Sequence, residues 1–182
     1  MRFALRARHA PVRPEGRELL FAAAILGVAV ALAFGPALSG GVLSWDDGRF
    51  VDDDPAVRHP GPSSISRVLT TTHAEAYHPL HRLVNVADRA AFGRSPTAFH
   101  ATSLVLWTAA LVAVVALLRR LGAGPWAALA GALVVGVHPL QAEAVAWISG
   151  KKDILAMLFF ASAAGVPCRV VKDRRQIGRA HV

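Results

Sequence analysis

The twenty residues Phe99–Leu118, FHATSLVLWTAALVAVVALL, contain no Asp, Glu, Lys or Arg. An α-helix of this length is about 30 Å long, which matches the hydrocarbon core of a bilayer. Three other stretches also lack these four residue types: 19–45, 121–142 and 154–168. The whole chain of 182 residues is 54% hydrophobic and only 18% charged. This composition excludes a soluble globular enzyme, a disordered chain and a disulfide-stapled secreted domain.

The apolar stretches predict an all-α fold of polytopic membrane helices, with a long outer loop that carries short interfacial helices. We expect a basic cytoplasmic head (1–18), a first transmembrane helix (19–43), an outer loop with an acidic cluster (44–97), a second transmembrane helix (98–118), a cytoplasmic turn (119–125), a third transmembrane helix (126–142), a second outer loop (143–153), the truncated start of a fourth transmembrane helix (154–165) and a tail foreign to the natural protein (166–182).

The basic residues orient these segments. Half of the net charge of +8 lies in the last 17 residues, and most of the rest flanks apolar segments. By the positive-inside rule, the Arg-rich head and the Arg119-Arg120 turn face the cytoplasm. Loops 44–97 and 143–153 then face outward, into the periplasm, the extracellular space or a lumen. No basic face with interleaved aromatic residues is present, so we expect no nucleic-acid partner.

The last segment differs in texture from the rest. Val166–Val182 is basic, loses the Ala/Leu/Val pattern and ends in IGRAHV, which a common sequencing adapter encodes in one reading frame. We therefore expect a non-native tail on a gene fragment, with a genuine basic cytoplasmic tail as the alternative. The chain has one cysteine, so no internal disulfide forms.

An acidic cluster follows the first apolar stretch. Asp46 and Asp47 are adjacent, and three more acids follow at Asp52–Asp54. A carboxylate beside the membrane can take the proton of a hydroxyl as a new bond forms, so Asp46 and Asp47 are candidate catalytic bases. The alternative is a solvated loop. The acidic cluster leaves the requirement for a divalent metal open. The spacing of His73, His78 and His81 matches no strong zinc signature, so we assign no metal site and no cofactor.

The triplet His-Pro-Leu occurs twice, beginning at His78 and at His138, both at expected outer-interface positions. Proline restricts the residue before it and ends a helix there, which presents each histidine at the edge of the bilayer. Each imidazole is therefore a candidate ligand for a phosphate oxygen. The alternative is a histidine at a helix end that bonds only to the backbone.

A third motif, Glu143–Asp153, contains the acid Glu143, the aromatic Trp147 and the pair Lys151-Lys152. These residue types suit the binding of an anionic lipid headgroup, because Lys is a compact partner for phosphate. Glu143, Lys151 and Lys152 are therefore candidate substrate-binding residues. The alternative is that the lysines only fix the orientation of the chain in the membrane and that Trp147 lies at the membrane interface.

Residues 80–92 place apolar side chains near one helical face: Leu80, Leu83, Val84, Ala87 and Ala91. Arg82, Asp88 and Arg89 fall mostly elsewhere. The pattern predicts an amphipathic helix that lies at the membrane interface or packs against neighbouring spans.

Four strings occur in one order: Trp45–Asp47 (WDD), Tyr77–Leu80 (YHPL), His100–Leu104 (HATSL) and His138–Asp153 (HPLQAEAVAWISGKKD). Together they resemble the N-terminal part of the multi-spanning glycosyltransferases that carry C-terminal tetratricopeptide repeats. That group is related to the protein O-mannosyltransferases and has the GT-C architecture. The resemblance covers roughly residues 19–165, and its last string is the most specific.

The resemblance implies transfer of a sugar from a lipid-phosphate-linked donor to a hydroxyl acceptor on a protein, at the outer membrane face. It places the base at Asp46 or Asp47, and donor contacts at His138, Glu143, Lys151 and Lys152. The chain departs from the pattern at Asp54-Pro55, where Asn-Pro is expected. Later spans and the repeats are missing, so we expect an incomplete donor cavity and an inactive fragment.

Two other classes compete with the transferase. A membrane-anchored tetratricopeptide-repeat scaffold without catalytic activity is the main alternative, and sugar transfer by the intact protein separates the two. A transporter or channel piece would place charged residues inside the spans, whereas here they cluster at the ends.

Overall fold

The computed structural model describes residues 14–43 and 46–165, and this part of the chain is helical and contains no β-strand. The predicted all-α membrane fold is confirmed. Most of the basic head, Trp45 and the tail 166–182 lie outside the described residues. The elements are α1 (Gly16–Phe34), the 3-10 turn η1 (Gly35–Ser39), the π turn η2 (Gly48–Asp52), α2 (Pro55–Arg58), α3 (Pro62–Thr70), α4 (Pro79–Phe92), α5 (Pro96–Arg120), α6 (Pro125–Gly136), η3 (Pro139–Gln141), α7 (Ala142–Ala146), η4 (Ile148–Gly150) and α8 (Lys151–Ala164).

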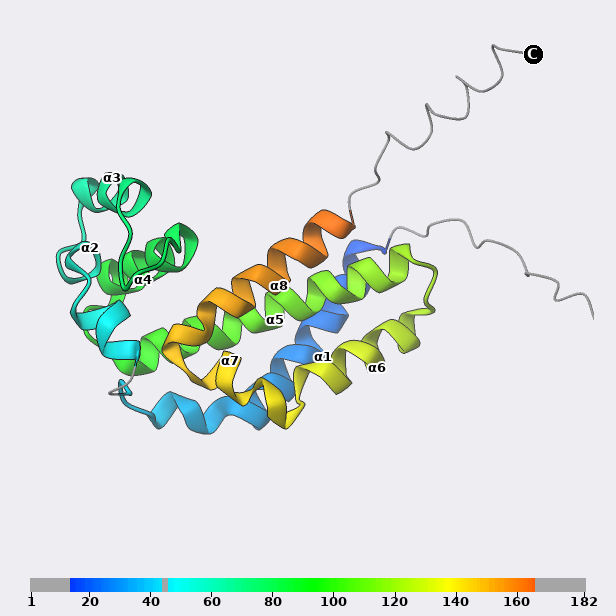
Figure 1. The fold of residues 1–182 in the computed structure, drawn as a ribbon. Coiled ribbons are helices and arrows are strands. Elements are labelled where there is room, and N and C mark those ends of the chain that lie inside the picture. The colour runs from blue at the N-terminus through cyan, green and yellow to red at the C-terminus, as the bar shows by residue number, and fades with distance from the viewer. Residues whose placement is uncertain (1–13, 44–45, 166–182) are drawn as a thin grey trace, which may run out of the picture.

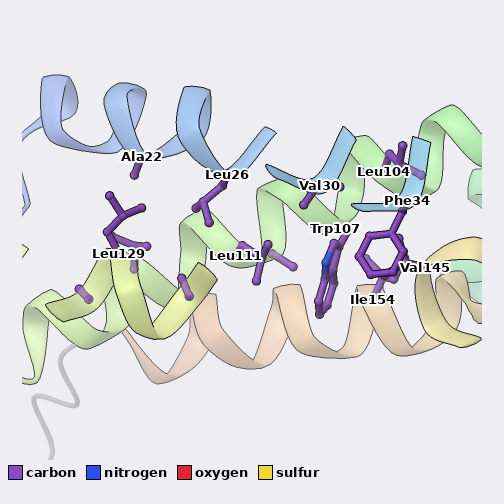
Figure 2. Packing of buried hydrophobic residues seen from close by; sticks show 14 residues of the cluster. Ala22, Leu26, Val30, Phe34, Leu104, Trp107, Leu111, Leu129, Val145 and Ile154 are labelled. Carbon is purple, nitrogen blue, oxygen red and sulfur yellow. The ribbon is translucent and has the colours of Figure 1, made fainter. Parts of the chain in front are cut away.

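Helix α5 packs against α1, α6 and α8 and so organises a bundle (Figure 1). Figure 2 shows the apolar core between these helices and α7. Trp107 of α5 is buried in this core, and its indole nitrogen donates a hydrogen bond to the Gly136 carbonyl at 3.0 Å. This bond satisfies both the buried indole and a free carbonyl at the end of α6.

Two helical segments are long and apolar enough to cross a membrane. They are Gly16–Ser39, which joins α1 to η1 over 24 residues, and α5, which has 25 residues. Each consists mostly of a run without Asp, Glu, Lys or Arg, residues 19–39 in the first and 96–118 in the second, and the charged residues lie at the helix ends. A continuous helix satisfies its own backbone groups, which suits an apolar run of this length.

The segment expected as a third span is bent. Helix α6 ends at Gly136, and a bend of 60° separates it from residues 139–146. His138 and Pro139 lie at this bend, because proline lacks the N–H that would continue the helix and restricts the residue before it. The pair counts as one further span only if the bent segments are taken together.

The two ends of the bundle differ in chemistry. At one end, which we call the arginine end, Arg119 Nε lies 2.5 Å from Glu18 Oε1, and Arg120 donates to the Gly165 carbonyl. These contacts fasten the start of α1 and the end of α8 to the end of α5. The opposite end, which we call the loop end, carries residues 46–95 and 137–150 (Figure 1).

Helices α2, α3 and α4 form a small unit at the loop end. Its apolar core is short: Ala56, Val57, Val68 and Val86, with Leu83 beside them. So small a core stabilises the unit only modestly, and buried polar contacts supplement it.

Helix α4 lies at residues 79–92, close to the helix predicted over residues 80–92, and the face that it buries against the rest of the protein is polar. The buried residues are mostly polar, and they are His81, Arg82, Asn85, Val86 and Asp88. Leu80 and Ala87, which belong to the predicted apolar face, are exposed on the surface of the protein. The buried charges find partners on distant segments, which compensates for the loss of water. That the apolar face lies at the membrane interface stays a prediction.

Candidate substrate site at the loop end

The acidic loop and the motif 143–153 meet at the loop end. Asp47 is fully buried, and its Oδ1 accepts hydrogen bonds from the backbone nitrogen and Oγ of Ser149, at 2.8 Å and 2.6 Å. Its Oδ2 accepts a third from the Leu43 nitrogen at 3.2 Å. Three donors on one carboxylate compensate for its burial and fix its position.

Asp46 has a different environment although it is the adjacent residue. Its side chain is half-buried, whereas that of Asp47 has no exposed surface. Adjacent side chains point in different directions, so one carboxylate can tie the loop to Ser149 while the other stays accessible. The structure thus distinguishes two carboxylates that the sequence left equivalent.

Lys151 lies inside the protein. Its Nζ donates to Asp88 Oδ2 at 2.6 Å and to Asn85 Oδ1 at 3.2 Å, and it lies 4.6 Å from the centre of the Phe99 ring. Burial lowers the pKa of Lys151, and the charge of Asp88 opposes this effect. The second oxygen of Asp88 accepts from Thr102 at 2.7 Å. This network joins α4, α5 and α8, and it keeps Lys151 away from a substrate in this conformation.

His78 and Lys152 come together in a pocket of about 340 Å³ between α4 and α8. Both side chains are half-buried. The remaining wall is mostly apolar, with Leu155 and Phe159 on successive turns of α8. A cation and an imidazole beside an apolar wall suit the binding of an amphiphilic anion.

His138 and Glu143 lie elsewhere at the loop end. His138 is exposed, and its Nδ1 accepts from the Leu140 nitrogen at 3.2 Å, which caps the turn η3. Glu143 is exposed in the first turn of α7. Neither residue lines the pocket of His78 and Lys152.

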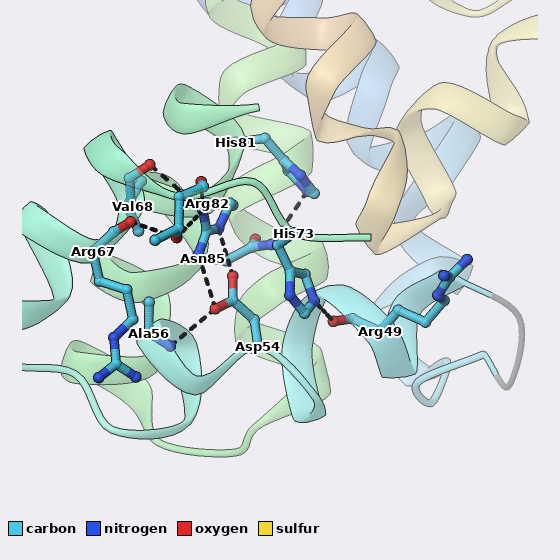
Figure 3. Close-up of polar contacts among 10 residues, drawn as sticks. Arg49, Asp54, Ala56, Arg67, Val68, His73, His81, Arg82 and Asn85 are labelled. Carbon is cyan, nitrogen blue, oxygen red and sulfur yellow. Dashed lines mark hydrogen bonds and ion pairs between the residues drawn. The ribbon is translucent and has the colours of Figure 1, made fainter. Parts of the chain in front are cut away.

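Sequence reasoning missed an internal ion pair. Arg82 donates through Nε to Asp54 Oδ2 at 2.7 Å and through Nη2 to Oδ1 at 3.1 Å, and both side chains are buried (Figure 3). Arg82 also donates to the Thr71 carbonyl at 2.7 Å. Burial alone would raise the pKa of Asp54, but the hydrogen bonds and charge of Arg82 outweigh it and lower the pKa.

The pair gives Asp54 a role in this chain at the position where the resemblance predicts Asn. Asp54 Oδ1 also accepts from the Ala56 nitrogen at 2.9 Å and so caps α2, a contact that Asn could make equally well. The charge of Asp, however, matches Arg82, which an amide would not. The only signal in the sequence was Arg82 in an amphipathic helix, and it did not identify a partner.

No group of three or more His, Cys, Asp or Glu side chains in residues 14–43 and 46–165 is arranged to hold a metal ion.

Known proteins match this chain over part of their length. Human protein O-mannosyl-transferase TMTC1 is 31% identical over 150 residues, which are 76% of this chain and 17% of that protein. Human protein O-mannosyl-transferase TMTC4 is 28% identical over 127 residues, or 62% of this chain and 17% of that protein. Mouse protein O-mannosyl-transferase TMTC2 is 36% identical over 91 residues, or 47% of this chain and 10% of that protein.

No protein-family model and no solved structure matches the chain. The chain is related in sequence to the protein O-mannosyl-transferases, of which it spans 17% or less in these three comparisons. The two long apolar helices and this relation fit an integral membrane protein.

Proposed function

We propose that this chain belongs to a membrane glycosyltransferase that moves a sugar from a lipid-phosphate carrier to a hydroxyl group on a protein, at the outer face of the membrane. The observation that carries this proposal is the pocket between α4 and α8, where His78 and Lys152 lie beside an apolar wall. The sequence relation to protein O-mannosyl-transferases supports the reaction class.

In this proposal the pocket holds the lipid phosphate of the donor. Lys152 supplies a positive charge and His78 a hydrogen bond, while the first isoprenoid units lie along Leu155 and Phe159. The charge of the phosphate increases as it leaves the sugar, so a nearby cation stabilises the transition state more than the ground state. Lys151 supports this site indirectly through its pair with Asp88.

His138 and Glu143 extend the site on the exposed side of the loop end. We assign them contacts with the sugar or the acceptor, because they are accessible and lie outside the lipid-phosphate pocket.

Asp46 is the proposed base. It orients the acceptor hydroxyl and takes its proton while the hydroxyl oxygen forms a bond to the anomeric carbon. The bond between that carbon and the phosphate oxygen breaks, and the lipid phosphate departs with both electrons. Asp47 is a positioning residue, because its three hydrogen bonds occupy it and fasten the loop to Ser149.

Binding of the carrier tests the proposal. The protein in nanodiscs should bind a fluorescent polyprenyl phosphate, and Lys152→Met should weaken binding by about tenfold or more, since loss of one charge-assisted contact has this effect. Lys152→Arg keeps the charge and should retain binding. The matched control is Arg94→Met, because Arg94 is an exposed cation paired with Asp52 at 2.9 Å, outside the pocket. Equal binding by Lys152→Met and wild type would contradict the assignment.

A further inference from the structure

The two adjacent arginines at the arginine end of the bundle differ in their partners. Arg119 Nε lies 2.5 Å from Glu18 Oε1, and Arg119 Nη1 donates to the Ala123 carbonyl at 2.6 Å. A carboxylate therefore neutralises Arg119. Arg120 donates to the Gly165 carbonyl, and within residues 14–43 and 46–165 no carboxylate forms an ion pair with it. No acid in these two ranges thus balances the charge of Arg120.

Arg120 lines a pocket of about 210 Å³ between α5 and α8, which we call the Arg120 pocket. Figure 1 shows these two helices lying side by side up to the arginine end. The other lining residues are Ala113, Ala116 and Leu117 of α5 and Ala161, Ser162 and Gly165 of α8. The alanines leave a space between the two helices that longer side chains would fill. The pocket therefore combines one cation with a mostly apolar wall.

The guanidinium group of Arg120 lies against Gly165. Its Nη1 donates to the Gly165 carbonyl, and a Cβ at position 165 would lie 3.4 Å from the same nitrogen. Glycine at this position therefore leaves room for the planar group. A guanidinium carries five N–H donors, of which a single carbonyl occupies only part. Ser162, an exposed residue of the same pocket, supplies a hydroxyl as a further donor.

The position of Arg120 along α5 indicates which anion is available to it. Arg120 is the last residue of a helix long enough to cross a membrane, so its charge lies near the boundary between hydrocarbon and headgroups. Lipid phosphates lie at this depth, and a guanidinium binds phosphate through two parallel hydrogen bonds. A charge without a partner is costly beside hydrocarbon, and a phosphate offsets this cost. A phosphate that carries an apolar chain therefore fits both parts of the pocket.

We propose that the Arg120 pocket binds an anionic phospholipid, with its phosphate on Arg120 and Ser162 and the start of one acyl chain between the alanines of α5 and α8. The volume favours a lipid over an enclosed small molecule, because sites of the second kind usually measure about 300–1,000 Å³. A lipid occupies the pocket with one end and leaves the rest in the bilayer. A zwitterionic headgroup carries its own cation, so a headgroup with a net negative charge is favoured. This inference goes beyond the proposed function and concerns the opposite end of the bundle.

Lipid selectivity tests the inference. The 182-residue chain is placed in micelles with an equimolar mixture of phosphatidylglycerol and phosphatidylcholine that carry the same acyl chains. Native mass spectrometry then measures how much of each lipid stays bound. We expect a preference for phosphatidylglycerol of about fivefold, the usual effect of one arginine on an anionic lipid. Equal retention of the two lipids would overturn the inference.

A first pair of variants tests whether the preference depends on Arg120. Arg120→Gln removes the charge but keeps an N–H donor for the Gly165 carbonyl, and it should abolish the preference for phosphatidylglycerol. The matched control is Arg17→Gln, because Arg17 is an exposed cation at the same end of the bundle and lies outside the pocket. Arg17→Gln should keep the preference. Equal losses in the two variants would show a general attraction to the basic end and would overturn the assignment to the pocket.

A second pair adds a charge instead of removing one, and it leaves the contact between Arg120 and Gly165 in place. Ser162 and Ala163 are adjacent and exposed on α8, but only Ser162 lines the pocket. Ser162→Glu places a carboxylate beside Arg120 and should abolish the preference for phosphatidylglycerol. Ala163→Glu adds the same charge outside the pocket and should retain it. An unchanged preference in Ser162→Glu contradicts the proposed site.

Inorganic phosphate distinguishes a lipid from a free anion. Millimolar phosphate should leave phosphatidylglycerol bound, because the free anion lacks the acyl chain that occupies the apolar wall. Displacement of the lipid by phosphate would overturn the lipid assignment. These outcomes are independent of the proposed function, since Arg120 and Ser162 lie outside the pocket of His78 and Lys152. Arg120→Gln should therefore bind polyprenyl phosphate as the wild type does.

Discussion

The Oγ of Ser149 lies 2.6 Å from Oδ1 of Asp47, across 102 positions of sequence. This contact joins the loop after the first apolar helix to the turn η4, which directly precedes α8. It makes one structural unit of the two motifs with candidate catalytic and donor-binding residues. Asp47 also accepts a hydrogen bond from the backbone N–H of Ser149. The contact between the two segments therefore depends more on the carboxylate of Asp47 than on the hydroxyl of Ser149.

Ser149→Ala should lower the free energy of unfolding by about 2 kcal/mol, because a hydrogen bond to a charged group contributes about 1.5–3 kcal/mol. Denaturant unfolding in detergent measures this change. Ser66→Ala is the matched control, since Ser66 is exposed on α3. Equal effects of the two substitutions would show that the Asp47 contact does not stabilise the fold.

Cysteine labelling should place the two ends of the bundle on opposite sides of the membrane, with the loop end outside, because the positive-inside rule predicts a cytoplasmic position for Arg119 and Arg120. In a Cys168→Ser background, a reagent confined to the cell exterior should label Glu75→Cys and leave Leu121→Cys unlabelled. Both positions are exposed. Labelling of Leu121→Cys but not of Glu75→Cys would contradict the placement of the candidate site at the outer face.

Acid should destabilise the protein through His81. The pKa of His81 is about 3 when folded and 6.5 ordinarily, so below about pH 6.5 the unfolded chain binds a proton that the folded protein does not. The contribution of the neutral His81 ring to the free energy of unfolding is therefore fully present above about pH 6.5. It falls as the pH drops below this value, by up to about 1.4 kcal/mol per pH unit. Unfolding measured between about pH 7 and pH 5 should show this slope, His81→Phe should reduce it, and His59→Phe should preserve it. An unchanged slope in His81→Phe would refute the burial of a neutral ring.

The Asp54–Arg82 pair should control stability in a lower pH range. The pKa of Asp54 is lowered from 3.8, so its contribution is present above 3.8 and is lost as the pH falls through the folded-state pKa. Asp54→Asn should cost about 3–5 kcal/mol at neutral pH, because Arg82 is left buried without its counter-charge. The same variant should lose less stability than wild type below about pH 3.8. Asp53→Asn, on the exposed neighbour, should behave as wild type in both ranges.

Sequence patterns predicted the long helices because the information is local. The charge-free run around Phe99–Leu118 lies within α5, and the Arg119-Arg120 pair follows at its end. The bend after Gly136 could also be anticipated from His138-Pro139, although the apolar run continues past it to residue 142. Local chemistry decides where a helix begins and ends.

The buried polar contacts could not be read from local patterns. Arg82 pairs with Asp54, 28 positions away, and Lys151 with Asp88, 63 positions away. Such pairs bury the polar face of α4, because a charge with a partner tolerates burial and a charge without one does not. The same holds for the candidate site. The sequence identified His78 and Lys152 separately, but only the fold shows that both line one pocket together with His81.

Sugar transfer by the Asp46 variant tests the central claim most directly. In membranes that contain the full-length protein, transfer of a labelled sugar from a polyprenyl-phosphate sugar to a Ser/Thr peptide is measured for Asp46→Asn and for Asp52→Asn, whose carboxylate pairs with Arg94 at the surface. The account predicts a fall in kcat of about 100-fold or more for Asp46→Asn at unchanged protein level, since general base catalysis contributes at least this much. Asp52→Asn should remain active. Transfer by Asp46→Asn at the wild-type rate would contradict the account.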